Sequence, residues 1–260
     1  MYVLDVATPA DGDPTPVVER LTDTFAETGA VAVVRRADVD APTHTTVRLG
    51  PSGRHVADES ASLSATLDDL ARSHEYAVTV GFADAALPRL AVGDAAADDP
   101  LVRVDSPAAL DPDAVLDALH GTDPHESLGS LVAASKRAAG AEFAGAIATF
   151  TGRVRAREDE DDERTEALRF EKYDGVADER LATIEAELGA RDGVQDVRLY
   201  HRTGRIEAGE DIVFAVVLAG HRGAAFRTVS DGIDRLKDEV PLFKKEVTVS
   251  DSFWRHERDV

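Results

Sequence analysis

Eight consecutive apolar residues, from Ile212 to Ala219, constrain most strongly how this chain can fold. The run is much shorter than the roughly 18 residues that a membrane-spanning helix needs. An uninterrupted apolar run of this length, closed by Gly220, is typical of a strand buried on both faces. The run therefore predicts a central strand, and neighbouring segments have to supply its partners.

The segments around this run predict a compact α+β domain. Residues 144–155 (AGAIATFTGRVR) alternate as a strand, and residues 167–173 and 194–204 are further strand candidates. Residues 175–193 have the three- and four-residue apolar spacing of a helix. Residues 242–257 are expected to close the chain as a hairpin.

The first half of the chain has a different pattern, in which strands and helices alternate. The stretch 15–29 places Val17, Val18, Leu21 and Phe25 on one helical face. Apolar strands precede and follow it, and this order favours an α/β layer with a parallel sheet. We expect two domains, residues 1–122 and residues 123–260.

The turn after the first strand, residues 7–21 (ATPADGDPTPVVERL), lacks the first glycine and the lysine of a phosphate-binding loop. Asp11 and Asp13 repel phosphate, while Pro14 and Pro16 have no N–H to donate. Nucleotide binding is therefore not expected at this turn.

Composition excludes several classes of function. The 260 residues carry a formal net charge of −21, which disfavours nucleic acid and anionic membranes as partners. The chain has no cysteine, so thiolate chemistry and cysteine-ligated metals are excluded. The first residues lack the pattern of a signal peptide, and we expect a cytoplasmic protein. The dispersed acidity and scarce lysine suggest a surface suited to high salt, that is, a halophilic protein.

Lysine is rare in this chain, yet three of its five lysines lie close together, at positions 237, 244 and 245. Pro241 is expected to end the helix over 221–240, so that the chain folds back between Lys237 and Lys244. Two converging ammonium groups lower each other's pKa, which suits acid–base or nucleophilic chemistry. The alternative is that Lys237 only complements the helix dipole, a contribution of about 0.3–1 kcal/mol, while the other two are solvated.

Three further groups of cationic residues attract attention. His221 and Arg222 open the predicted helix, where free N–H groups attract anions, although they could also form a cap or a surface ion pair. Arg153 and Arg155 follow a strand, and Arg155 alone would be a routine surface residue. His201 is interpreted as structural.

The predicted helix is long enough to place two of these candidate residues far apart in space. His221 and Lys237 are sixteen residues apart, which is roughly 24 Å along a helix. One small ligand cannot contact both ends. If both ends serve one site, a second copy has to supply one of them, and we expect a symmetric dimer with pockets shared between copies.

The segments AGAIATFTGRVR, VQDVRLYHRTGRIEAGEDIVFAVVLAGHRGAAF and DRLKDEVPLFKKE together resemble the large, catalytic subunit of molybdopterin synthase, from Gly145 to Arg258. The resemblance implies sulfur transfer to cyclic pyranopterin monophosphate from the C-terminal glycine thiocarboxylate of a small ubiquitin-like subunit. It implies a central dimer flanked by two small subunits, a heterotetramer, and requires no cofactor or metal. Phe243 replaces the family's usual tryptophan, and Val176 replaces a common methionine.

The same resemblance implies roles for individual residues. Lys237 and Lys244 match the lysines that handle acyl and proton transfers at the thiocarboxylate. The expected pterin phosphate site comprises Arg153, Val154, Arg155, His221, Arg222, Lys245 and Glu246. Arg258 falls where the family has an arginine donated by the partner subunit.

Two other readings of the chain stay open. Residues 17–36 and 76–94 resemble the P-loop domain of molybdopterin-guanine dinucleotide adaptor proteins, without its phosphate-binding residues, so we expect a degenerate domain with a structural or interaction role. The alternative to an enzyme is a non-enzymatic docking or attachment partner of ubiquitin-like proteins.

Overall fold

The computed structural model divides the chain into two compact units, Met1–Ser130 and Leu131–Val260. It describes residues 1–36, 46–50, 53–57, 62–160, 162–173, 175–248 and 252–255. The division falls within helix α4 (Leu128–Ser135), whereas the sequence placed a boundary near residue 122.

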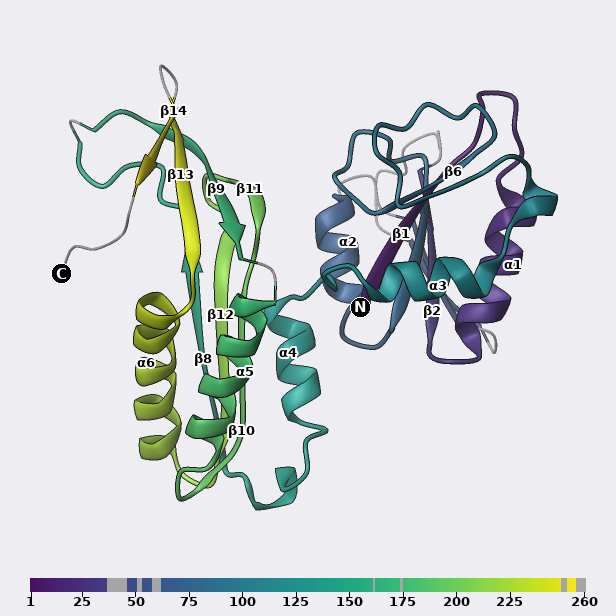
Figure 1. Ribbon diagram of the computed structural model, residues 1–260. Coiled ribbons are helices and arrows are strands. Elements are labelled where there is room, and N and C mark those ends of the chain that lie inside the picture. The colour runs from purple at the N-terminus through teal and green to yellow at the C-terminus, as the bar shows by residue number, and fades with distance from the viewer. Residues whose placement is uncertain are drawn as a thin grey trace. The chain divides into compact units, whose positions relative to one another are not determined.

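The first unit is built on a parallel sheet, as the sequence predicted (Figure 1). Its strand order is β2 (Val31–Arg35), β5 (Tyr76–Val80), β1 (Tyr2–Ala7), β6 (Arg89–Val92) and β7 (Val102–Val104), and each neighbouring pair is parallel. Strands β3 (Thr46–Gly50) and β4 (Gly53–Ala57) form a separate antiparallel pair.

Helices of the first unit belong to two apolar clusters. Helices α1 (Thr15–Ala26) and α3 (Pro112–His120) share one cluster with β1, β5 and β6. The four apolar residues predicted to face inward from α1 are all buried. Helix α2 (Leu63–Leu70) packs through Leu67 in another cluster, with Val3, Ala32 and Ala77. The sheet therefore has helical cover on both faces, the arrangement expected of an α/β layer.

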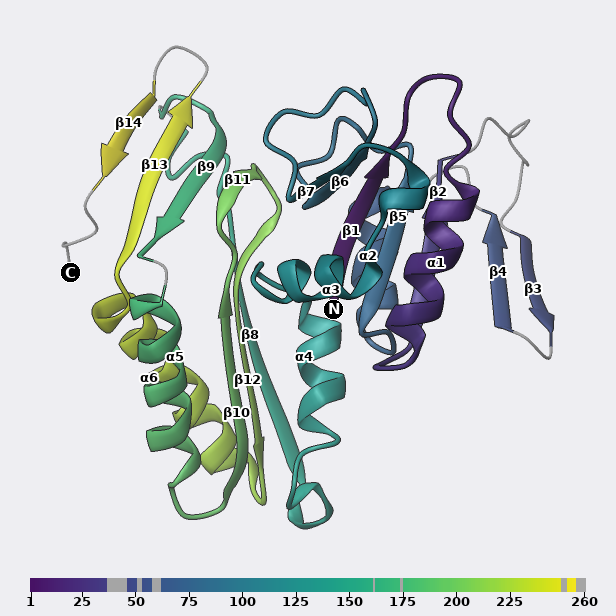
Figure 2. The same ribbon diagram turned by 45° about the vertical axis from the view of Figure 1, so that its right-hand side comes forward.

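The second unit contains two antiparallel sheets (Figure 2). The first has the order β10 (Val194–His201), β12 (Asp211–Ala219) and β8 (Ala146–Arg153). Strand β12 carries the apolar run and is central, as predicted. Helices α5 (Val176–Gly189) and α6 (Arg222–Glu239) pack against this sheet around a core that includes Ile184, Leu188 and Ile233.

The other sheet has the order β11 (Gly204–Glu207), β9 (Thr165–Lys172), β13 (Leu242–Thr248) and β14 (Ser252–Arg255). Strands β13 and β14 form the predicted C-terminal hairpin. Strand β11 was not predicted, because it is a four-residue strand that pairs with β9 far earlier in the chain.

One expectation about α6 was wrong. Its apolar residues recur three and four positions apart, a spacing that predicts an inward-facing Phe226 together with Val229 and Ile233. The neighbouring Ala225 is buried instead, and Phe226 is 66% exposed. Packing in the core of this unit therefore does not account for the large apolar side chain of Phe226.

Candidate functional site

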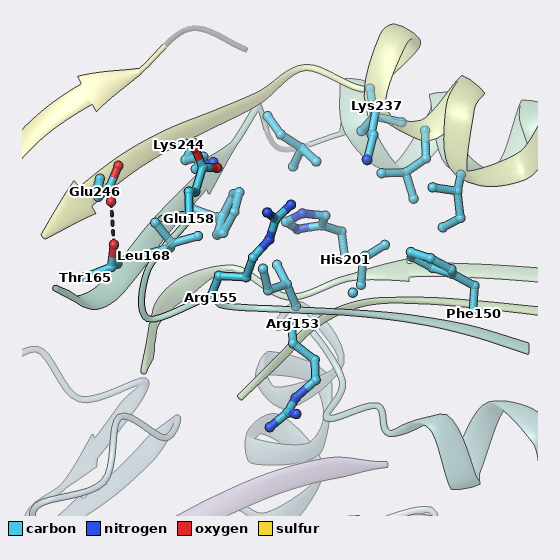
Figure 3. Close-up of a pocket in the computed structure, with 18 of the residues that line it drawn as sticks. Phe150, Arg153, Arg155, Glu158, Thr165, Leu168, His201, Lys237, Lys244 and Glu246 are labelled. Atoms are coloured by element: carbon cyan, nitrogen blue, oxygen red, sulfur yellow. Dashed lines mark hydrogen bonds between the residues drawn. The ribbon is translucent and has the colours of Figure 1, made fainter. Parts of the chain in front are cut away.

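A cavity of about 510 Å³ lies in the second unit, where the two sheets and the end of α6 meet (Figure 3). Its lining comes from the end of β8 and the segment after it, from β9, from the last residue of β10, from the last turns of α6 and from β13. Leu168, Phe170 and Leu236 form part of the apolar lining. The lining falls in three separate parts of the sequence, residues 150–170, 201–213 and 233–248, so the cavity exists only in the folded unit.

Lys237 and Lys244 both line this cavity. Helix α6 ends at Glu239, and Val240 is already extended, with φ −87° and ψ 124°. The N–H of Val240 donates to Leu236, and the chain then enters β13 at Leu242. The proline at 241 thus marks the predicted fold-back, and it brings the two lysines to one cavity from a helix and a strand. In Figure 3 the amine of Lys237 points toward the space above His201.

Strand alternation separates the residues of β13 into two faces. Leu242, Lys244, Glu246 and Thr248 line the cavity, whereas Lys245 does not. Lys245 is in register with Arg169 of β9. Glu246 accepts a hydrogen bond from the hydroxyl of Thr165, which fixes the carboxylate against the neighbouring strand.

The two arginines after β8 also differ. Arg155 extends into the cavity, and Figure 3 shows its guanidinium group beside the ring of His201. Arg153 is also among the lining residues, but its guanidinium group turns away from the other labelled residues in Figure 3. It donates two hydrogen bonds to the carbonyl of Gly209 and lies 3.6 Å from Asp211. Val154, between them, is only 2% exposed and packs with Leu168 and Phe170. Only Arg155 of the three presents a cationic group to the cavity.

His221 and Arg222 lie at the opposite end of α6 from Lys237 and do not line the cavity. His221 is the residue before the first turn of the helix, and Arg222 is its first residue. Arg258 lies outside the described residues. The structure therefore gathers Lys237, Lys244, Arg155 and Glu246, and leaves His221, Arg222 and Lys245 elsewhere.

Sequence interpretation missed two contributors to the cavity. His201 was taken as structural, yet it is the last residue of β10 and faces the cavity. The high charge of residues 157–164, before β9, predicts a solvated loop, yet Glu158, Asp162 and Glu163 are among the lining residues. The pairing of β10 with β12 could have suggested the place of His201, because it puts His201 at the same end of the sheet as Arg153.

The cavity is therefore lined by cationic side chains, by hydrogen-bonding side chains and by apolar side chains. Arg155, Lys237 and Lys244 can attract anions, and amines can transfer protons. Among the residues that the structure describes, no group of three or more histidine and acidic side chains is arranged to hold a metal ion. Within the same residues, no helix is long and apolar enough to cross a membrane.

Comparisons with known proteins point to one enzyme family. A sequence profile described as "MoaE protein" matches residues 124–239. A probable molybdopterin synthase of Haloferax volcanii is 49% identical over 211 residues, which cover 81% of each chain. Because this match is longer than the second unit, it extends into the first. A molybdopterin synthase catalytic subunit of Yersinia pestis is 36% identical over 115 residues, 44% of this chain and 75% of that protein.

For the first unit, the comparison with solved structures gives a match of another kind. A MobB protein homologue from Bacillus stearothermophilus is 14% identical; the match covers 47% of this chain and 100% of that chain, with a TM-score of 0.37. No residue role or activity is transferred from that structure to this chain.

Proposed function

This chain belongs to the family of molybdopterin synthase catalytic subunits, and from that premise we propose that its second unit carries out sulfur transfer. The substrate is cyclic pyranopterin monophosphate, and the sulfur donor is the C-terminal thiocarboxylate of a small ubiquitin-like subunit. The observation that carries this proposal is the convergence of Lys237 and Lys244 on one cavity.

The charges in the cavity suit both reactants. A cyclic phosphate and a thiocarboxylate are anions, and the protein as a whole carries a net charge of −21. Arg155, Lys237 and Lys244 supply cationic groups that can pair with these anions, in a cavity that is also lined by Glu158, Asp162, Glu163 and Glu246. Arg155 can hold a phosphate through paired N–H donors, while the lysines can also give up a proton.

Each lysine is held by a rigid element. Lys237 is in the last turn of α6, one residue after the buried Leu236. Lys244 is in the ladder of β13, opposite Phe170 of β9. This placement supports direct roles for both amines in acyl and proton transfer at the thiocarboxylate, because catalysis depends on groups fixed within reach of the reacting atoms.

We also propose that the working unit is a dimer. Strand β8 has β12 as its neighbour in the sheet formed by the described residues, and its other edge carries no strand. Antiparallel pairing of β8 with its counterpart about a two-fold axis would bring the Ala146 end of one copy to the Arg153 end of the other. His221 follows Ala219, which pairs with Ala146, so His221 and Arg222 would approach the neighbouring copy's cavity.

Exposed apolar side chains support this dimer. Ile147 on β8 is 37% exposed, and Phe226 on α6, a helix that packs on β8, is 66% exposed. Phe143, just before β8, is 70% exposed. Burial of such residues between copies contributes about 25 cal/mol for each Å² removed from water. The dimer would therefore complete the anion site and cover the apolar side chains at once.

Reconstituted turnover tests the proposed function. Thiocarboxylated small subunit and cyclic pyranopterin monophosphate are mixed with the parent protein, Lys237→Ala or Lys244→Ala, and molybdopterin is measured. Each substitution is expected to reduce turnover by at least about a hundredfold, because each removes a group that acts in the transition state. Lys136→Ala, an exposed lysine after α4, is the matched control and should keep the parent's rate.

The same variants discriminate the alternative, a non-enzymatic docking partner. Calorimetric binding of the small subunit is measured in parallel with turnover. Retained binding with lost turnover supports the enzyme. Parent rates in both lysine variants would reject the proposed roles.

A further inference from the structure

His201 lies where a reacting group would be expected, although its sequence context was interpreted as that of a structural residue. It is the last residue of β10 and lines the cavity with Lys237 and Lys244. Figure 3 shows its ring at the centre of the labelled residues, below the amine of Lys237 and beside Arg155. A polar ring in this position touches the space that the substrates would occupy.

The hydrogen bond of its Nδ1 fixes the tautomer of the neutral ring. Nδ1 is 2.7 Å from the backbone carbonyl oxygen of Arg202. A carbonyl oxygen only accepts, so Nδ1 carries the proton and the lone pair is on Nε2. The N–H of Arg202 donates to the carbonyl of Ile212 at 2.8 Å, which ties the accepting residue to the start of β12.

A second contact fixes the plane of the ring. Phe170 of β9 is 7% exposed, and its ring meets that of His201 edge-on, with centroids 4.6 Å apart and an interplanar angle of 68°. The imidazole is thus held by a backbone acceptor on one side and by a buried aromatic ring on the other. Such fixed orientation is what a proton acceptor needs.

The charged groups around this ring come from every wall of the cavity. They are Lys237 on α6, Lys244 and Glu246 on β13, Arg155 and Glu158 after β8, and Asp162 and Glu163 before β9. A lysine ammonium group has only protons to donate, whereas a neutral imidazole ring has a lone pair that can accept a proton.

Sulfur transfer from a thiocarboxylate requires one hydrolytic step. When the sulfur bonds to a pterin carbon, it displaces an oxygen substituent of that carbon, and the acyl group of the small subunit stays attached to the sulfur as a thioester. Water then has to add to the acyl carbon, the acyl carbon–sulfur bond breaks, and the products are the carboxylate of the small subunit and the thiol of the pterin. No oxidant or reductant is needed, but one proton has to leave the water and one has to reach the sulfur.

We propose that Nε2 of His201 is the general base that takes the proton from this water, while a lysine ammonium protonates the departing sulfur. This inference rests on the proposed sulfur transfer and assigns its individual steps to different residues. The lysines serve the steps that form and release carbon–sulfur bonds, and His201 serves only the attack of water on the thioester.

Two substitutions of His201 separate its possible roles. His201→Asn keeps a side-chain N–H near the position of Nδ1 and removes the basic nitrogen. His201→Gln places a polar group near Nε2 that does not accept a proton at neutral pH. In single-turnover experiments with thiocarboxylated small subunit and cyclic pyranopterin monophosphate, mass spectrometry follows the covalent adduct of the two reactants and its decay.

Both variants are expected to form the adduct at the parent's rate and to hydrolyse it about a hundredfold more slowly, so that it accumulates. Added imidazole should partly restore hydrolysis, and the decrease in the parent's hydrolysis rate on acidification should disappear in the variants. Hydrolysis at the parent's rate in His201→Asn would overturn the inference. So would a parallel fall in adduct formation and hydrolysis that imidazole does not relieve, which would indicate a structural role.

The proposed function fails in a different way from this inference. If sulfur transfer itself is wrongly assigned, the parent protein forms neither adduct nor product. If only the role of His201 is wrong, the parent turns over normally and the variants do not accumulate the adduct.

Discussion

The two units of this chain use arginine in opposite ways. In the first unit, Arg89 donates to Asp5 at 2.8 Å and to the carbonyls of Phe82, Ala83 and Ala85. Arg103 donates to three carbonyls of the loop after β6, and Arg20 donates to two carbonyls around residues 107–110. In the second unit, Arg155 extends into a cavity together with Lys237 and Lys244.

This difference shows that cationic residues indicate a binding site only when the fold leaves them facing space. Arg20, Arg89 and Arg103 of the first unit are bound by groups of their own unit. The turn before α1 has Asp13, whose carboxylate accepts the N–H of Thr15 and whose pKa is lowered by that hydrogen bond. An anion at this turn would meet a carboxylate instead of N–H groups. In the second unit, Arg191 and Arg235 pair with carboxylates, but Arg155, Lys237 and Lys244 face a substrate-sized cavity.

The largest expected effect concerns the internal pair of the first unit. Asp5 is 1% exposed and also accepts from Thr79, so Asp5→Ala leaves Arg89 without its buried counter-charge. We expect a loss of about 3–5 kcal/mol in the free energy of unfolding, measured by chemical denaturation. Asp84→Ala, which breaks the exposed pair with Arg36, is the control and should not change stability measurably. Equal effects of the two substitutions would contradict the comparison.

The next effect concerns the cation that faces the cavity. Arg155→Ala removes charged hydrogen bonds to the substrate phosphate, and we expect kcat/KM to fall about tenfold to a hundredfold with unchanged stability. Arg36→Ala, an exposed arginine of the first unit, should leave kcat/KM as it is. If the two variants lose activity equally, Arg155 has no direct role in binding.

Mixing two inactive variants tests whether Arg222, at the start of α6, contributes to a site shared between two copies. Lys237→Ala and Arg222→Ala are each expected to lose most activity, because each disables both sites of a dimer. After the two variants exchange subunits, half of the dimers are mixed and have one intact site, so about a quarter of the parent's activity should return. No recovery despite verified subunit exchange would place Arg222 outside the shared site.

The smallest expected effect is a pH dependence of stability in the second unit. Burial raises the pKa of Glu185, which accepts the N–H of Leu199 at 2.6 Å. Because its folded-state pKa is above the unfolded value, Glu185 favours folding most at low pH, and this contribution is lost as pH rises through the folded-state pKa. Glu185→Gln should therefore gain stability relative to the parent from about pH 4 to 7, on the order of 1 kcal/mol at most. A difference independent of pH in denaturation would contradict this account.

Much of the fold was determined by local sequence patterns. The buried residues of α1, the cap of α3 by Asp111, the central position of β12 and the end of α6 before Pro241 all follow from spacing, capping or backbone chemistry within one segment. Such features depend on neighbours along the chain, so a single sequence is enough to predict them.

Which residues line the cavity was decided by the tertiary structure alone. Alternation puts Lys244 and Lys245 on opposite faces of β13, but only the pairing of β13 with β9 determines which face meets the cavity. Likewise, Arg155 enters the cavity while Arg153 bonds to Gly209, and His201 comes to face Lys237 through the joining of two sheets. These arrangements arise from contacts between distant segments, which no local pattern encodes.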